Sequence, residues 1–148
     1  MSSGLDLVRR MAKVHEQVSR REVADAVTEL TGAETVLGHL LRERDGLRHR
    51  LQVEATSGAA AGALADGYRY LGALEMRIGE ARESVEALGQ TLLERETAWM
   101  GKRKELRGLD TVHARRLRAE SARRERRVQK ALDDLKRPES PVLALEIE

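Results

Sequence analysis

One stretch of the chain, residues 71–113, carries apolar side chains at alternating steps of three and four residues. The positions on this line are Leu71, Leu74, Ile78, Ala81, Val85, Leu88, Leu92, Arg95, Trp99, Lys102, Leu106, Leu109 and His113. Ten of the thirteen are apolar. A 3-4 alternation averages 3.5 residues per turn, so it draws one narrow line along a long helix. Because a globular helix presents a wider apolar sector, the line predicts a seam that needs a partner helix.

The composition favours a coiled coil over a compact core. Among 148 residues there are no Phe, one Trp and two Tyr, while 35% are charged. A chain with many Ala, Leu, Glu and Arg residues at helical spacing is typical of a coiled coil. Intrinsic disorder is the competing interpretation for so charged a chain. Since the seam continues over about six heptads, we expect the body of the protein to be ordered.

A looser apolar pattern precedes this seam and predicts the partner helix. Its members are Leu7, Met11, Val14, Val18, Val23, Val27, Leu30, Leu37, Leu40, Leu41, Leu47 and Leu51. The pattern is interrupted around residues 20–25, and the cluster at residues 37–41 has two interpretations. Either the register slips there, or this face meets a second partner.

The two patterns predict one fold, an all-α antiparallel two-helix coiled-coil hairpin with unequal arms. We expect a first helix over about residues 4–55, a turn over about 56–62 and a second helix over about 63–136. The turn is expected where small residues and two glycines cluster without charge. These parts form one domain, residues 1–137, and two prolines separate it from an expected flexible tail, residues 138–148. After pairing from the turn, about 20 residues of the second helix should extend beyond the first.

Charge is segregated along the chain, although the formal net charge is only +2. Residues 102–137 hold fourteen Lys or Arg and six Asp or Glu, a local net charge of +8. Residues 1–101 have a net charge of −3, and the tail adds three Glu. Clustered charge of one sign attracts a partner of the opposite sign.

Several classes of protein are disfavoured by what the sequence lacks. There is no cysteine, so disulfides and thiolate metal sites are excluded. We expect neither a signal peptide nor a membrane-spanning helix, because no apolar run is long enough. The histidines, His15, His39, His49 and His113, are too dispersed to share a metal. We therefore expect a cytoplasmic, non-enzymatic protein without a cofactor or a metal.

Polar and aromatic residues on the seam have two interpretations each. Arg95, Lys102 and His113 either cover the seam with their stems while their polar ends reach solvent, or act as a register lock or an opening for another protein. Trp99 is either a core residue or a partly exposed anchor at a partner site, because a large ring is hard to bury in a thin two-helix seam.

An arginine-rich stretch near the end of the second helix is the other candidate site. Its members are Arg115, Arg116, Arg118, Arg123, Arg124, Arg126 and Arg127. It has three interpretations: a solvated helix face, a nucleic-acid-binding surface, or a surface for an acidic protein or pore. No aromatic residues interleave to stack on bases, so nucleic-acid binding lacks support from the sequence.

The layout of residues 1–137 resembles the FliJ family, the small coiled-coil component of the flagellar protein export apparatus, and its type III secretion counterparts. The shared features are a first helix of about 50 residues, a small-residue turn and a longer second helix. The local match is a Trp-plus-basic pattern, formed by Ala98, Trp99, Lys102, Lys104, Leu106, Leu109, Arg115 and Arg116.

The resemblance implies a stalk similar to the shaft of rotary ATPases. Its termini would insert in the hexameric ring of the export ATPase, which assigns the arginine-rich stretch to the ring. The hairpin would also contact the cytoplasmic domain of the membrane export gate, through a patch near the turn, and would escort export chaperones. The residues that fall in that patch are Leu40, Leu47, Tyr70, Leu74 and Ala81. Leu47 and Glu43 stand where relatives commonly have aromatic residues.

Two other classes of function remain open from the sequence. One is a generic structural coiled coil that tethers or dimerises. The other is a basic rod that binds nucleic acid, which would show a steep dependence of DNA binding on salt.

Overall fold

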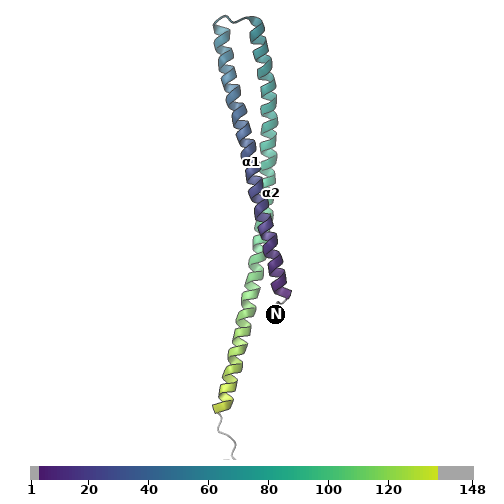
Figure 1. Ribbon diagram of the computed structural model, residues 1–148, viewed down its shortest axis with the longest axis vertical. Helices are drawn as coiled ribbons and strands as arrows, with labels where there is room; N and C mark the ends of the chain where they lie inside the picture. The colour runs from purple at the N-terminus through teal and green to yellow at the C-terminus, as the bar shows by residue number, and fades with distance from the viewer. Residues whose placement is uncertain (1–3, 137–148) are drawn as a thin grey trace, which may run out of the picture. The chain divides into compact units, whose positions relative to one another are not determined.

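The computed structural model describes residues 4–136 as two long helices joined by a short connection (Figure 1). Helix α1 spans Gly4–Thr56 and helix α2 spans Ala61–Lys136. The helices pack against each other in opposite directions, which confirms the all-α antiparallel hairpin with unequal arms. The expected tail, residues 138–148, lies outside the described residues.

The connection between the helices is a glycine-capped turn. The backbone N–H of Ala59 donates to the carbonyl oxygen of Glu54 at 3.1 Å, and Gly58 between them has φ of +80°. This 6→1 hydrogen bond around a left-handed residue is the Schellman arrangement that ends many helices. A side chain at position 58 would disfavour that φ, so the glycine fixes where α1 stops.

Two compact units make up the hairpin. The larger unit is residues 13–103, which contains the turn and the facing parts of α1 and α2. The smaller unit combines the chain up to Ala12 with the chain from Lys104 onward.

The hydrophobic core of the larger unit lies near the turn. Five buried side chains form it, here called the leucine cluster: Leu40, Leu47, Leu51, Leu74 and Ile78. Leu74 and Ile78 are only 1% exposed. Leu37, Leu41, Leu64, Leu71 and Ala81 pack around the cluster and are half-buried.

The expected core face of the first half of α1 is wrong at most of its positions, although Val23 and Leu30 are half-buried as expected. Leu7, Met11, Val14 and Val18 are each more than half exposed. Beside Gly38 and Leu41, which are half-buried, the buried or half-buried positions of α1 in the larger unit are Glu16, Ser19, Val23, Ala26, Leu30, Ala33, Leu37, Leu40, Arg44, Leu47 and Leu51. These positions also alternate in steps of three and four, so they form the true seam of α1. Its start contains Glu16 and Ser19, two polar residues that carry no apolar signal in the sequence.

Candidate functional site

The predicted gate patch is mostly core. Leu40, Leu47 and Leu74 belong to the leucine cluster, and Ala81 is half-buried against it. Tyr70 is different, because its side chain is 48% exposed. Of the five residues in the patch, Tyr70 is therefore the one whose ring is open to a partner, while the others shape the hairpin beneath it.

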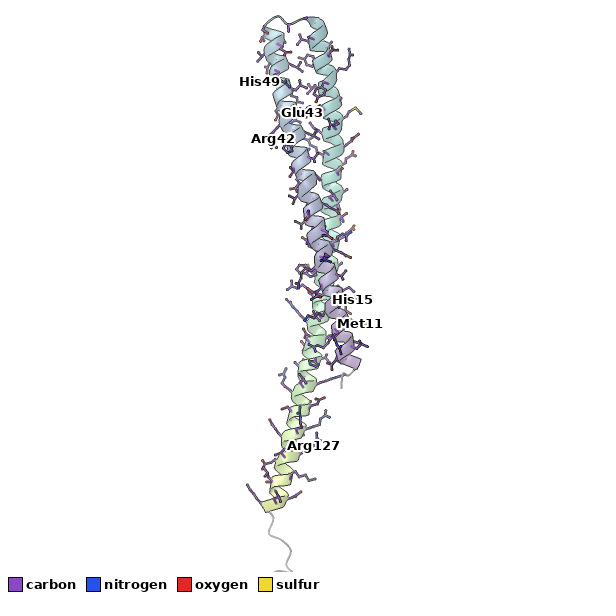
Figure 2. All side chains as sticks on the ribbon, viewed as in Figure 1. Met11, His15, Arg42, Glu43, His49 and Arg127 are labelled. Atoms are coloured by element: carbon purple, nitrogen blue, oxygen red, sulfur yellow. The ribbon has the colours of Figure 1, made fainter. Side chains whose placement is uncertain are left out.

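The Tyr70 hydroxyl contacts the first helix. It donates a hydrogen bond to the Glu43 carboxylate of α1, a residue labelled in Figure 2. This hydrogen bond, reinforced by the negative charge of Glu43, raises the pKa of Tyr70 above its usual value. The pair presents an aromatic ring and a carboxylate together on one face near the turn.

Another face of the same region holds a second aromatic residue, which the sequence analysis did not single out. Tyr68 is 54% exposed and lines a cavity of about 430 Å³. The other lining residues are Arg48, Leu51, Gln52, Ala55, Thr56 and Leu71. Arg48 forms an ion pair with Glu75 at 2.6 Å, which links α1 to α2 beside the leucine cluster.

The arginine-rich stretch is exposed along its whole length. All seven predicted arginines, from Arg115 to Arg127, are exposed, and within the described residues none of them has an ion pair. Figure 2 shows side chains in this part of α2, where Arg127 is labelled, pointing away from the helix in several directions. The structure thus presents the stretch as accessible positive charge.

Three of the seven arginines continue the line along which α2 meets α1 in the smaller unit. In that unit, His113 lies 3.4 Å from the Asp6 carboxylate, and Asp110 pairs with Arg9 at 2.9 Å. The same 3-4 spacing beyond His113 reaches Arg116, Glu120, Arg123, Arg127 and Lys130. The seam of α2 therefore becomes a mainly basic line over residues 116–130.

Trp99 is half-buried and bonded within the hairpin. Its indole N–H donates to the Glu16 carboxylate at 3.1 Å, and Arg20 donates to the same oxygen at 2.7 Å. The Arg103 guanidinium lies 4.9 Å from the centre of the indole ring. Two hydrogen bonds lower the pKa of Glu16, and the one from Trp99 has a larger effect than the one from Arg20. Glu16 is only 4% exposed.

Two other polar seam residues, Arg95 and Lys102, also lie against α1. Arg95 pairs with Glu22 of α1 at 3.5 Å, and Lys102 is half-buried beside α1. A register lock therefore has physical support at Arg95, and Glu16 is a stronger lock that sequence reasoning missed. The sequence around Glu16 gives no such signal until the facing indole is known.

Within residues 4–136, no group of three or more His, Cys, Asp or Glu side chains is placed to hold a metal ion. In that same range neither helix has a segment long and apolar enough to cross a membrane.

Comparison with known proteins gave one match. Residues 1–137 match the model of the family described as Flagellar FliJ protein. A search of the curated proteins and a search of the solved structures each found no match. The family match covers all but the last eleven residues of the chain.

Proposed function

Because the chain belongs to the flagellar FliJ protein family, we propose that it is a non-enzymatic coiled-coil stalk of the flagellar protein export apparatus. In this role one end of the hairpin inserts in the ring of the export ATPase. The region near the turn contacts the cytoplasmic domain of the export gate. The protein works in the cytoplasm and associates with the inner membrane through these partners.

The observation that carries the ring assignment is the exposed basic line of α2. The seam of α2 pairs with α1 up to His113 in the smaller unit and is mainly basic beyond it. Exposed arginines without ion pairs among the described residues retain their full attraction for an acidic surface. A continuous helix also keeps these charges in a fixed order, which suits insertion into an opening lined by carboxylates.

The gate contact is supported by Tyr70 and Glu43. Tyrosine combines a large apolar ring with a polar end and is enriched where proteins bind each other. Leu40, Leu47 and Leu74 contribute indirectly in this proposal, because their burial holds the two helices together under the exposed pair. Escort of export chaperones is a further part of the role that family membership supports.

The test uses two variants, each of which should lose one of the two proposed interactions and keep the other. One variant reverses four charges to Glu at Arg123, Arg124, Arg126 and Arg127. We expect it to lose stimulation of the ATPase and to retain binding to the gate domain in a pull-down. The other variant, Tyr70→Ala, should lose gate binding and retain stimulation. Stimulation by the wild type should also weaken as salt rises, because exposed charges are screened.

Matched controls separate these effects from changes of net charge or helicity. The same number of reversals can be made at exposed arginines of the larger unit, Arg50, Arg69, Arg77 and Arg82. This control should stimulate the ATPase normally. Since a run of Glu repels itself along a helix, an Arg→Gln version of the first variant should show the same loss with unchanged circular dichroism. Normal stimulation by both the Glu and Gln versions would contradict the ring assignment.

A further inference from the structure

A hollow lies between α1 and α2 in the part of the larger unit that contains Trp99. Its volume is about 320 Å³. The lining residues are His15, Val18, Ser19, Glu22, Ala98 and Lys102. Ser19 and Ala98 are small, so they leave space between the helices that leucines fill in the leucine cluster. The small side chains of Ser19 and Ala98 therefore account for the hollow.

A second hollow of about 360 Å³ adjoins the first and lies among exposed side chains of α1 alone. It is lined by Val14, Gln17, Val18 and Arg21. Val18 lines both hollows and is 52% exposed, while Val14 is 55% exposed. We call this surface, formed by the two hollows and the two valines, the valine groove. His15, labelled in Figure 2, lies at its edge.

The apolar residues of the valine groove are spaced to receive a helix. Val14 and Val18 are four residues apart, so they lie one above the other on the same side of α1. A helix with heptad spacing could pack its apolar side chains around this ridge and into the hollows on either side. Recognition by added β-strand pairing needs a sheet edge, and the described residues form only helices and a turn.

The charge around the valine groove is positive, which favours an acidic partner. Residues 13–22 and 95–103 hold six Lys or Arg and three Glu, a local net charge of +3. Glu16 pairs with Arg20 and Glu22 pairs with Arg95, and each of these pairs is neutral. The net charge of the two segments therefore stays at +3, which favours a partner with carboxylates beside its apolar stripe.

We propose that the valine groove is a docking site for an amphipathic helix whose apolar stripe is flanked by Asp and Glu. The apolar side chains of that helix cover Val14 and Val18 and enter the two hollows. Its carboxylates lie near Arg21 and Lys102, which line the groove. A second copy of this chain is disfavoured as the occupant, because two copies of the groove would bring like charges together. The site uses no residue of the proposed gate or ring surfaces.

The experiment measures binding of a synthetic helical peptide by calorimetry. The probe is about three heptads long, with Leu at the a and d positions and Glu at the e and g positions, whose mutual repulsion limits self-pairing. We expect it to bind the full chain and to change the fluorescence of Trp99, the single Trp, which is adjacent to Ala98. A peptide with Lys at e and g should bind at least about tenfold more weakly.

The discriminating variant is Val18→Glu, with Val36→Glu as its matched control. Val18 and Val36 are on the same helix and are 52% and 54% exposed, so the substitutions perturb folding similarly. Val18→Glu should weaken binding of the acidic peptide about tenfold, because it removes apolar contact and adds repulsion. Val36→Glu should bind as the wild type does. Val14→Glu is a second groove variant, to be used if circular dichroism shows that Val18→Glu is unfolded.

Four results would overturn the proposal. The first is absence of binding by the acidic peptide, and the second is equal binding of the acidic and basic peptides. The third is equal affinity of the groove variants and Val36→Glu. A wild-type dimer in sedimentation that Val18→Glu dissociates would likewise overturn it, since the occupant would then be a second copy.

Discussion

The two halves of the larger unit share one spacing but use it for different chemistry. Near the turn, the seam positions are filled by the leucine cluster, and two of its members are almost completely buried. Around Trp99, the facing seam positions on α1 are Glu16, Ser19, Val23 and Ala26, of which only Val23 is a large apolar residue. Apolar burial supplies stability without fixing alignment, whereas a buried hydrogen bond to a carboxylate is satisfied in only one alignment. The comparison indicates that one half holds the hairpin closed and the other sets its register.

The largest expected effect is in the leucine cluster. Ile78→Ala should lower the free energy of unfolding by about 3 kcal/mol, because it removes a fully buried side chain and leaves a cavity. Urea unfolding followed by circular dichroism measures the loss. Leu93→Ala is the control, since Leu93 on the same helix is 58% exposed and should cost less than about 0.5 kcal/mol. Equal losses would mean that this half does not supply the stability.

A smaller effect is expected at the indole. Trp99→Phe keeps an aromatic ring but removes the N–H that reaches Glu16, so it should cost about 1 kcal/mol in unfolding free energy. The measurement is again urea unfolding by circular dichroism. Met100→Leu, one residue along and 59% exposed, serves as the control and should be close to neutral. A loss as large as that of Ile78→Ala would indicate that Trp99 is a core residue and not an alignment contact.

The smallest expected effect is a change with pH. Because the pKa of Glu16 is lowered from its ordinary 4.5, chiefly by the Trp99 hydrogen bond and then by Arg20, ionised Glu16 stabilises the folded state. That contribution is fully present above pH 4.5 and is lost as the pH falls through the lowered value. The stability difference between wild type and Glu16→Gln should therefore be largest near neutral pH and shrink in acid.

The Trp99→Phe background tests the cause of that pH dependence. With the indole donor removed, the difference caused by Glu16→Gln should shrink less in acid, because the principal cause of the lowered pKa of Glu16 is gone. Unfolding midpoints measured across the acid range provide the check. An identical pH dependence in both backgrounds would place the cause at Arg20 instead.

Sequence reasoning succeeded where the seam is apolar. The structure leaves none of the thirteen positions from Leu71 to His113 fully exposed, and the hairpin fold follows from that line and the glycine-containing turn. In α1 the same reasoning selected Val14 and Val18, which are exposed, over Glu16 and Ser19, which are buried. Hydrophobicity decides a helix face only when the facing residues are also apolar, and here the facing residue is an indole whose N–H donates to Glu16.

The sequence by itself determined that the chain forms two long helices, where they turn, and which line of α2 is their seam, because periodicity and turn chemistry are local properties. Tertiary structure alone decided which face of α1 meets that line, since this depends on side chains of the other helix that are distant in the sequence. The Trp99–Glu16 hydrogen bond spans 83 residues. A second contact between the helices, near the turn, joins Gly67 of α2 to Leu51 of α1. A Cβ on Gly67 would collide with the Leu51 side chain. Neither contact can be predicted from the residues that are next to it in the sequence.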